Sequence, residues 1–475
     1  MPFASTLFLN MFLPVVILCY YPMKWISANR LRNLILLIFS YLFYLFGAAE
    51  FFILLVASTA ADYLLGLLIE KYRSQARLWV VFSLFINLGL LIYFKYTNFF
   101  IAEFNRIATG HGIPNILFPA ITLPIGISFF TFQKISYIID IFRRHANAKA
   151  NFVDFALYVA MFPKLISGPI VRFKDIQQQL SMRTESFERF SSGALRFCWG
   201  LAKKILIADA CGQIADVVFS LSPTLLDTKT SWLGAIAYTL QIYFDFSAYS
   251  DMAIGLAALF GFTLLENFNR PYAAISITDF WRRWHISLSC WFKDYLYIPL
   301  GGSHKGRSRT YFNLVAVFLL CGLWHGANWT FVAWGLYHGV FLVLERISGI
   351  RQLSEKRWVV ARRTLTLLIV IFGWVLFRSE NLTAALSFWH AMVVPLNLPP
   401  TFELYSVLHY RNITFIGLAL IGLLGASRLP RPVDFIVIRN AFVTGIGWIL
   451  LGIALPYCEA FLMDYPGNPF IYFRF

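Results

Sequence analysis

Apolar runs of roughly membrane-spanning length, separated by short polar loops, make up most of this chain. A helix needs about 20 consecutive apolar residues to cross a bilayer. In the amino-terminal part of the chain, such runs lie near residues 3–21, 31–46, 50–69, 78–100 and 116–142. Near the carboxy terminus, they lie near residues 364–377, 413–427 and 441–463. This pattern predicts an all-α polytopic membrane protein whose first run is a retained span rather than a cleaved signal peptide.

Basic residues gather in alternate loops between the first runs. The loops Lys24–Arg32, Lys71–Arg77 and Arg143–Lys149 are basic, whereas the loops at 47–50 and 102–115 carry almost no base. Cytoplasmic loops of membrane proteins carry an excess of Lys and Arg. We therefore predict that the basic loops lie in the cytoplasm and that the amino terminus faces outward.

The regular pattern breaks in the middle of the chain. Met161–Pro169 places two prolines, a glycine and a lysine inside an apolar run. Irregular backbone at membrane depth is tolerated only where protein or a cavity surrounds it, so a re-entrant segment is predicted. The mixed-charge stretch Arg172–Arg189 is expected to be amphipathic at a membrane surface, and Lys203 and Lys204 are expected to snorkel to that surface.

Composition fits a membrane protein. Of the 475 residues, 59% are hydrophobic and only 13% are charged. At about 20 residues per span, the runs leave room for roughly eleven crossings or partial crossings and for no separate soluble domain. The net charge is +16, but the bases lie in short loops, so the positive-inside rule explains them better than nucleic acid does. Anionic lipid headgroups or a phosphate-bearing donor are further partners for these bases.

Several kinds of site have no signature in this sequence. The six cysteines occur singly, with no Cys-x-x-Cys pair, so neither a disulfide framework nor a metal site is predicted. The sequence also lacks a phosphate-binding P-loop, a dinucleotide-binding glycine motif, a His-Glu-x-x-His motif and a nucleophile elbow. ATP-driven pumping and zinc hydrolysis thus lose their usual signatures, and histidine chemistry within a membrane remains.

The first candidate histidine lies in a tryptophan-rich segment at residues 280–293. On a helix with 100° per residue, one face of this segment is aromatic and apolar, and Arg282, Arg283 and Lys293 lie on the other. The apolar face comprises Trp281, Trp284, His285, Leu288, Trp291 and Phe292. His285 is therefore expected to be buried.

The second candidate, His325, lies deeper in the apolar sequence. From Tyr311 to Leu344 the chain has no Asp, Glu, Lys or Arg, so His325 is expected at bilayer depth, between helices packed closely through Gly322 and Gly326. Imidazole is costly in hydrocarbon without a partner or a water-filled cavity. One interpretation is a structural histidine bonded to a neighbouring helix, but the rarity of such residues in membranes favours a functional one. His338 would lie about 220° around a continuous helix from His325 and is interpreted as structural.

Two carboxylates interrupt the apolar run at residues 232–262. Asp245 and Asp251 would bond backbone groups or pair with Arg282 or Arg283 in a structural role, or orient a histidine or line a polar path in a functional one. The structural interpretation is favoured for Asp251, and both stay open for Asp245. A transporter that uses Asp245 and His325 as a path, or a non-catalytic membrane scaffold, is therefore an alternative function.

Several longer motifs are similar to one known family. They are Tyr243–Ala253, Asn267–Tyr272, Asp279–Leu288, Asp294–Gly302, Gly322–Ala327 and the terminal Pro469–Phe475. On these motifs the sequence resembles the membrane-bound O-acyltransferase (MBOAT) family, and within it the membrane subunit of bacterial alginate O-acetylation systems. The family's invariant histidine matches His325, and its second characteristic position matches His285.

The resemblance implies a fold. It is strongest over residues 120–345 and extends more loosely over nearly the whole chain. It implies a single integral-membrane domain over 1–475, with a core at about 120–345 and peripheral helices at 1–115 and 360–475. Members of the family form a helical bundle in which re-entrant and interfacial helices surround a central tunnel.

The resemblance also implies an activity. It predicts an O-acyltransferase in the bacterial inner membrane that passes acetyl from a cytoplasmic donor of the acetyl-CoA type, with no bound cofactor, toward an exported polysaccharide such as alginate. Periplasmic acetyltransferases or polymer-processing proteins are the expected partners. Acetylation of cellulose or peptidoglycan, and transfer of D-alanine toward teichoic acid, remain alternatives within the family.

On this basis His325 is expected to be the general base, a role that typically contributes about 10² to 10⁴-fold in rate. His285 is expected to orient the donor, assist proton movement or polarise the carbonyl group. Supporting or donor-binding roles are expected for Asp245, Trp281, Arg282, Arg283, Trp284, Trp324, Lys305 and Arg307. For each of the four bases taken singly, solvated loop charge is the favoured explanation.

Overall fold

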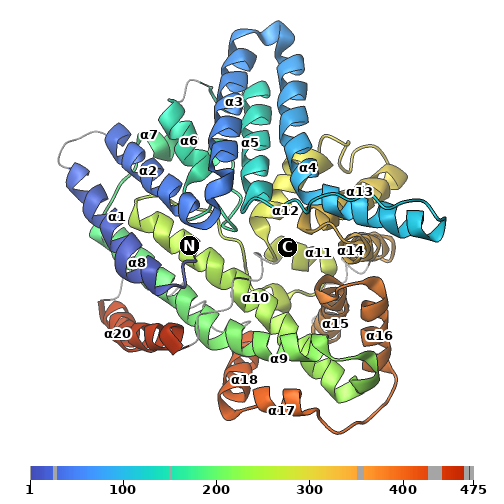
Figure 1. Ribbon diagram of the computed structural model, residues 1–475. Helices are drawn as coiled ribbons and strands as arrows, with labels where there is room; N and C mark the ends of the chain where they lie inside the picture. Colours follow the sequence, from blue (N-terminus) through green and yellow to red (C-terminus); the bar gives the residue numbers. More distant parts are fainter. Residues whose placement is uncertain are drawn as a thin grey trace. The chain divides into compact units, whose positions relative to one another are not determined.

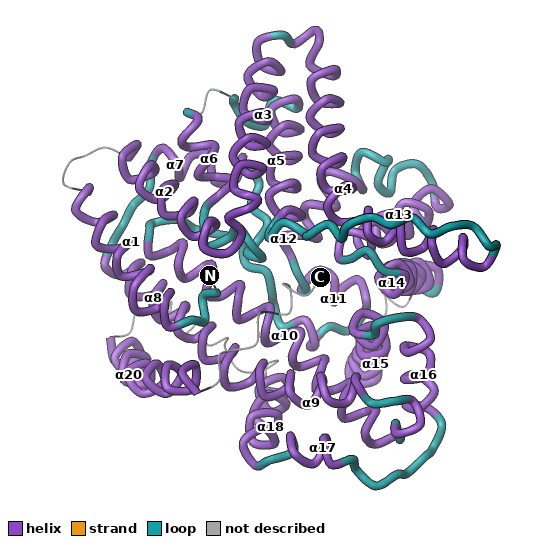
Figure 2. The backbone as a smooth tube through the Cα atoms, viewed as in Figure 1, coloured by secondary structure: helices purple, strands orange, loops and turns teal. Residues whose placement is uncertain are grey.

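The computed structural model describes residues 2–24, 29–148, 151–349, 358–425, 441–464 and 470. All regular structure in these residues is helical (Figure 1), and Figure 2 shows helices joined by loops, with no strand in this part of the chain. The predicted all-α class is confirmed. The chain forms two compact units, unit 1 (Met1–Phe190 with Ala257–Leu264) and unit 2 (Ser191–Leu256 with Leu265–Phe475).

Unit 1 is built from the amino-terminal helices. Its helices are η1 (Phe8–Phe12), α1 (Leu13–Tyr20), η2 (Tyr21–Lys24), α2 (Asn29–Ala48), η3 (Ala49–Phe51), α3 (Phe52–Lys71), η4 (Arg73–Gln75), α4 (Ala76–Gly110), α5 (Ile127–Phe142), α6 (Phe152–Ala160) and α7 (Phe173–Ser181). Figure 1 shows α3 and α4 joined by a tight turn, with α5 beside α3. A buried polar cluster ties these three helices together: Asp62 accepts hydrogen bonds from Ser83 and Asn87, and lies 3.6 Å from the ammonium group of Lys134.

The run predicted at 116–142 is only partly helical. Helix α4 continues to Gly110, beyond the predicted loop boundary at residue 102, and a long loop follows before α5 begins at Ile127 (Figure 2). Pro114, Pro119 and Pro124 recur along this loop. Each proline lacks the N–H group that a helix interior requires, so an apolar sequence alone could not make this stretch helical.

The irregular stretch after α6 is buried, as predicted. Residues 161–165 and 167–171 are all buried in the protein. The ammonium group of Lys164 donates hydrogen bonds to the side-chain oxygen of Gln133, at 2.5 Å, and to the carbonyl oxygen of Tyr158. Two neutral acceptors inside the protein therefore hold the side chain of Lys164. The re-entrant course of this stretch in the membrane stays a prediction.

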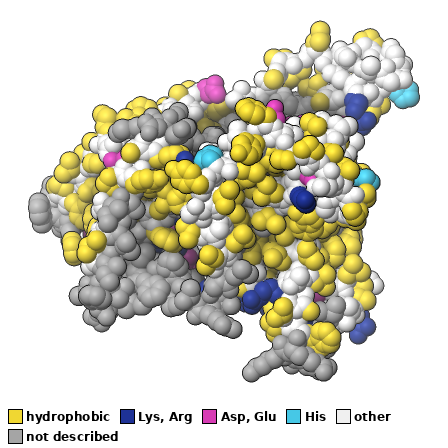
Figure 3. Space-filling view, turned by 90° about the horizontal axis from the view of Figure 1, so that it is seen from below, with side chains coloured by type: hydrophobic (Ala, Val, Ile, Leu, Met, Phe, Trp, Pro, Cys, Tyr) yellow, Lys and Arg dark blue, Asp and Glu magenta, His cyan; other side chains and the backbone are white. Residues whose placement is uncertain are grey.

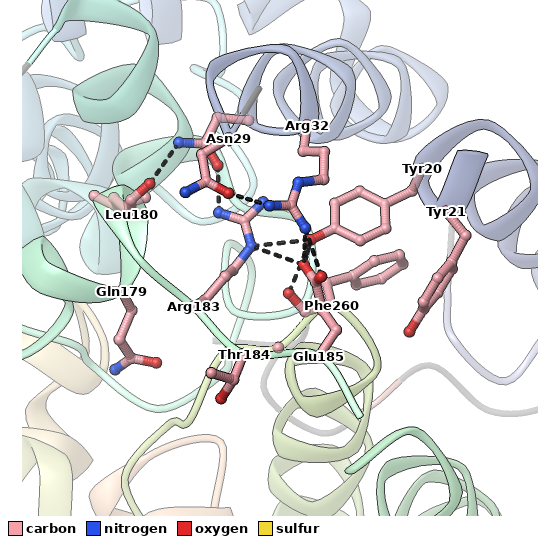
Figure 4. Close-up of polar contacts among 12 residues, drawn as sticks. Tyr20, Tyr21, Asn29, Arg32, Gln179, Leu180, Arg183, Thr184, Glu185 and Phe260 are labelled. Atoms are coloured by element: carbon pink, nitrogen blue, oxygen red, sulfur yellow. Dashed lines mark hydrogen bonds and ion pairs between the residues drawn. The ribbon is translucent and has the colours of Figure 1, made fainter. Parts of the chain in front are cut away.

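Helix α7 is amphipathic, in line with the expectation for Arg172–Arg189. Phe173, Ile176 and Leu180 are buried along one side of the helix. The chain that follows is anchored by charge: Figure 4 shows the guanidinium groups of Arg32 and Arg183 converging on the carboxylate of Glu185.

Unit 2 holds both candidate histidines. Its helices are most of α8 (Phe187–Ala202), η5 (Lys203–Ala208), α9 (Asp209–Ser220), η6 (Pro223–Leu225), most of α10 (Thr228–Leu259), η7 (Pro271–Ala273), α11 (Ile277–Arg283), α12 (Ile286–Phe292), η8 (Lys293–Tyr297), α13 (Arg307–His325), α14 (Trp329–Ile347), α15 (Val359–Arg378), α16 (Leu382–Val393), α17 (Phe402–Val407), α18 (Tyr410–Gly425) and α20 (Ala441–Asp464). The three apolar runs predicted near the carboxy terminus coincide with α15, α18 and α20. The terminal motif Pro469–Phe475 lies outside the described residues except for Phe470.

Glycines bring α13 and α14 into close contact. A Cβ atom added to Gly322 would lie 2.2 Å from the carbonyl oxygen of Phe331, and one added to Gly335 would lie 2.3 Å from that of Phe318. A Cβ atom at Gly326 would meet the ring of Phe331 at 2.1 Å. The predicted packing through Gly322 and Gly326 is therefore confirmed.

Hydrophobic side chains cover much of the surface. Three helical stretches within the described residues are long and apolar enough to cross a membrane, namely Asn29–Lys71, Arg73–Gly110 and Val359–Arg378. Large apolar side chains such as Ile53 and Phe85 are more than 70% exposed, and Figure 3 shows a face dominated by hydrophobic residues. Such a surface fits contact with lipid rather than with water.

Candidate active site

The chain breaks between α11 and α12, and His285 stands at the break. Helix α11 starts at the N-cap Ser276, whose side chain accepts the N–H of Asp279 at 3.0 Å, and it ends at Arg283. His285 has φ 43° and ψ 56°, in the left-handed region that residues other than glycine rarely adopt. The continuous helix expected over residues 280–293 is therefore wrong.

The expected burial is nevertheless confirmed. All six side chains of the predicted apolar face are buried: Trp281, Trp284, His285, Leu288, Trp291 and Phe292. Arg282 and Lys293 are exposed. Each of the two short helices keeps its own apolar side toward the core, so the burial pattern survives the break.

Hydrogen bonds on both sides hold the left-handed turn at His285. The N–H of Ile286 donates to the carbonyl oxygen of Asn267 at 2.9 Å, and the N–H of Asn269 donates to that of Arg283, also at 2.9 Å. The side chain of Asn267 accepts from the hydroxyl of Ser287 at 2.7 Å. A non-glycine residue in this conformation costs about 1–3 kcal/mol and persists only where its surroundings enforce it.

Asn267 also links this turn to α10. Its side-chain amide donates to the hydroxyl of Ser250 at 3.1 Å, and its side chain is buried. The ring of His285 packs edge-on against Phe246 of the same helix, with 4.7 Å between centroids. Asn267 and α10 thus fix the position of the imidazole.

His325 is the last residue of α13 and lies among aromatic rings. Its ring centroid is 4.9 Å from that of Trp324, 5.2 Å from that of Trp334 and 5.1 Å from that of Phe377. The side chain of Asn328 caps the next helix by accepting the N–H of Thr330 at 3.0 Å. Helix α13 ends at His325, because Gly326 follows it and Asn328 caps the start of the next helix.

The indole of Trp324 brings the two predicted histidines into one site. Its ring centroid lies 6.4 Å from that of His285 and 4.9 Å from that of His325. All three side chains are buried. A site walled by aromatic rings excludes water, and electrostatic interactions within it are stronger than in solution.

The other predicted tryptophans extend the same aromatic cluster. The ring of Trp284 lies 4.8 Å from that of Trp374, and the ring of Trp281 lies 5.6 Å from that of Trp334. His338 packs 5.1 Å from Trp334. Because α13 ends at His325 and α14 starts at Trp329, the angle predicted between His325 and His338 on a continuous helix does not apply. Neither ring nitrogen of His338 has a hydrogen-bond partner within the described residues.

The carboxylates of α10 belong to a buried ion network. Asp245 accepts from Lys204 at 2.7 Å, and Asp251 accepts from Lys203 at 2.6 Å and from Arg196 at 2.7 Å. The predicted pairing of these acids with Arg282 or Arg283 is therefore wrong. The predicted snorkelling of Lys203 and Lys204 is also wrong, since both side chains are buried against these acids.

The four predicted donor-binding bases lie apart from this network. Arg283 pairs with Asp279 at 2.8 Å, one helical turn earlier. Arg282, Lys305 and Arg307 are exposed, as expected for solvated charge and for side chains that meet an anionic donor.

Several residues of the site were not predicted. They are Ser250, Asn267, Trp334, Trp374 and Phe377. Asn267 lies within one of the motifs noted in the sequence, but nothing there marks it as a partner of the His285 turn. Trp334 and Phe377 lie on other helices than His325 and contact it only because these helices pack together. No local sequence pattern could identify them.

Comparisons with known proteins identify the family of this chain. The family model described as MBOAT, membrane-bound O-acyltransferase family, matches residues 79–389. A Pseudomonas aeruginosa protein named "Probable alginate O-acetylase AlgI" is 47% identical over 82% of this chain and 75% of its own length.

Two further relatives extend the comparison. A protein of the same name from Azotobacter vinelandii is 48% identical over 82% of this chain and 78% of its own length. The peptidoglycan O-acetyltransferase of Helicobacter pylori is 38% identical over 82% of this chain and 79% of its own length. This chain is therefore a multi-pass membrane protein and an O-acyltransferase, and it belongs to the membrane-bound O-acyltransferase family.

Proposed function

We propose that this protein passes an acetyl group from a cytoplasmic thioester of the acetyl-CoA type across the bacterial inner membrane for O-acetylation of an exported polysaccharide such as alginate. The observation that carries the proposal is the convergence of His285 and His325 on Trp324 in a buried aromatic site. The relatives named for alginate O-acetylation support the choice of polymer.

In this proposal His325 is the general base. The attacking hydroxyl gives its proton to the imidazole as its oxygen bonds to the thioester carbonyl carbon. The carbon–sulfur bond then breaks, and the departing thiolate takes up the proton. Histidine suits both proton transfers because its ordinary pKa lies near working pH, and such catalysis typically contributes about 10² to 10⁴-fold.

His285 has the second role. Its backbone is fixed by Asn267 and its ring by Phe246, so the imidazole is preorganised to orient the donor or to polarise the carbonyl oxygen as negative charge develops. Arg282, Lys305 and Arg307 would meet the phosphates of the donor, since exposed bases attract anions at a membrane surface. Asp245 supports the site from within the ion network of α10.

The test follows radiolabelled acetyl from acetyl-coenzyme A in proteoliposomes that contain the purified protein and periplasmic extract. We expect His325→Ala to lower transfer by about 10² to 10⁴-fold while the protein stays inserted. His111→Ala, an exposed histidine in the loop after α4, serves as the matched control and should transfer at the wild-type rate. Undiminished transfer in His325→Ala would show that His325 is not the general base.

Peptidoglycan is the second candidate acceptor, because one relative is named for its acetylation. Polysaccharide and peptidoglycan fragments added to the same assay distinguish the two polymers by which one becomes labelled. Periplasmic acetyltransferases or polymer-processing proteins are the proposed partners, since the site lies within helices of a membrane protein and the polymer lies outside. Label that reaches the polymer without any extract would show that no such partner is needed.

A further inference from the structure

A polar cavity of about 630 Å³ opens within unit 1, beside the amino-terminal end of α2. Helices α2, α3, α6 and α7 contribute to its wall, through residues that include Arg30, Tyr63, Asp154 and Gln177. Small-molecule sites typically enclose about 300–1,000 Å³. This cavity therefore has room for an organic ligand and not only for single waters.

Internal hydrogen bonds hold the wall of the cavity in place. The side-chain amide of Asn33 donates to the carboxylate of Asp154 at 2.6 Å and to the carbonyl oxygen of Leu180 at 2.9 Å. The buried guanidinium of Arg183 donates to Asn33 from behind, and that of Arg32 donates to Asn29. Since both arginines are also held by Glu185 (Figure 4), the wall is preformed.

The cavity has an anionic and a cationic side. One carboxylate oxygen of Asp154 accepts from Asn33, and the other has no hydrogen-bond donor in the described part of the chain. Arg30 lies in the first turn of α2 and forms no ion pair with any described residue. The first turn of a helix also directs free N–H groups and a partial positive charge outward. A ligand with both an ammonium and a phosphate group would satisfy the two sides together.

The cavity lies at the end of a candidate membrane span, which indicates a position at the membrane surface. Asn29 is both a lining residue and the first residue of the candidate span Asn29–Lys71. Helix α7 contributes Phe173 and Leu180 of its buried apolar side to the wall. The end of a membrane span lies where lipid headgroups lie.

We propose that this cavity binds the headgroup of a phospholipid of the phosphatidylethanolamine class. The lipid phosphate lies against Arg30 and the amino-terminal turn of α2, and the ammonium group lies against Asp154. A phosphatidylglycerol headgroup offers the phosphate but no ammonium, so it leaves the carboxylate unmatched. This proposal does not rest on the proposed acyl transfer, and either can fail without the other.

The test measures lipid retention by native mass spectrometry of the full-length protein with equal amounts of phosphatidylethanolamine and phosphatidylglycerol of the same acyl chains. We expect the wild type to favour phosphatidylethanolamine by about tenfold, the effect of one hydrogen bond to a charged group. Asp154→Asn should abolish that preference, and Arg30→Gln should weaken the retention of both lipids. Equal retention of the two lipids by the wild type would overturn the proposal.

Two controls keep the test decisive. Glu103→Gln and Arg106→Gln disrupt a surface ion pair of α4 outside the cavity and should leave retention unchanged. Arg30 makes no described bond, so Arg30→Gln keeps the fold even if Asp154→Asn does not, and unchanged retention in that variant would count against the site by itself.

Two soluble competitors identify the source of the headgroup. Failure of glycerophosphoethanolamine, which has no acyl chains, to displace the lipid supports a membrane lipid as the ligand. Displacement by that compound would assign the cavity to a soluble ligand, and displacement by coenzyme A would assign it to the acyl donor. Either displacement overturns the proposal.

Discussion

At the scale of single residues, the left-handed backbone of His285 is the feature of the proposed active site that departs most from ordinary geometry. The conformation is unfavourable by about 1–3 kcal/mol, and the bonds of Asn267 after the turn and of Asn269 before it enforce it. A strained residue at a candidate catalytic position indicates that the imidazole must point in one direction. Asn267 is therefore a positioning residue for His285.

Replacing Asn267 with Ala should lower the turnover number by about 10²-fold, since misplacing a reacting group by about 1 Å costs that much. The Michaelis constant for the donor should change little, because the exposed bases remain. Steady-state transfer kinetics measure both values. Asn267→Asp keeps the acceptor for Ser287 and should recover part of the turnover.

Asn412→Ala is the matched control for that variant. Asn412 is another buried asparagine of unit 2, where it donates to Gln213 at 2.8 Å and to the carbonyl oxygen of Val407 at 2.9 Å. Its loss should reduce stability without a selective loss of turnover. An equal fall in turnover for both variants would mean that Asn267 acts only through the fold.

At the scale of helices, the contact of α13 with α14 fixes the position of His325 at the end of α13. Gly322→Ala should force the two helices apart, because its Cβ atom would lie 2.2 Å from a backbone oxygen. Overpacking of this kind costs about 1–3 kcal/mol, so both the melting temperature in detergent and acetyl transfer should fall. Gly89→Ala, with no atom within 4 Å of the added Cβ, should lower neither, since Ala is more favourable than Gly within a helix. An unaltered melting temperature in Gly322→Ala would contradict the close approach.

The stability of the amino-terminal end of α10 should depend on pH, through the carboxylate of Asp227. Asp227 accepts the N–H of Thr230 at 2.9 Å and that of Leu398 at 3.2 Å. Burial alone would raise the pKa of Asp227, but the hydrogen bonds from Thr230 and Leu398 outweigh it and hold the pKa below its usual value. A depressed pKa means that the stabilisation is complete above the ordinary value of about 4 and is lost as the pH falls through the lower folded value.

Asp227→Asn should therefore melt below the wild type at neutral pH, since an N-cap contributes about 0.5–2 kcal/mol. The difference in melting temperature should shrink below about pH 4, as the wild-type carboxyl gains its proton. Thermal melts of both proteins across pH check this. A difference that stays constant with pH would show that the charge of Asp227 is not what stabilises α10.

Helical periodicity predicted burial better than it predicted helices. The six side chains on one face of residues 280–293 are buried, yet the helix breaks at His285, because the bonds that hold the left-handed turn come from Asn267 and Asn269, outside the segment. The predicted helix near residue 116 failed because prolines interrupt an apolar sequence that hydropathy alone does not distinguish from a span. The partner of Lys204 on α10 could not be predicted, since Asp245 lies far along the chain and is brought close only by packing.

At the scale of the whole molecule, composition and loop charge together predicted a polytopic helical protein, and the family match agrees. The side of the membrane on which each loop lies rests on the distribution of bases. Alkaline phosphatase fused after Gly110, at the end of α4, should be active, because the loop that follows is predicted to face outward. The same enzyme fused after Gln75, in the basic turn before α4, should be inactive. The reverse pattern of activities would invert the predicted topology.

The buried ion network of unit 2 has a consequence for how the chain enters the membrane during synthesis. Lys203 leaves the ribosome well before Asp251, its partner on α10, whereas Lys204 pairs with Asp245 of α10 and also with the nearby Asp209. A lone charge at the centre of a bilayer costs about 2.5–3.5 kcal/mol even by insertion scales, so α8 and η5 are poor candidates for release into lipid on their own. These segments should therefore wait in the insertion machinery until α10 follows and leave it together as one neutralised group.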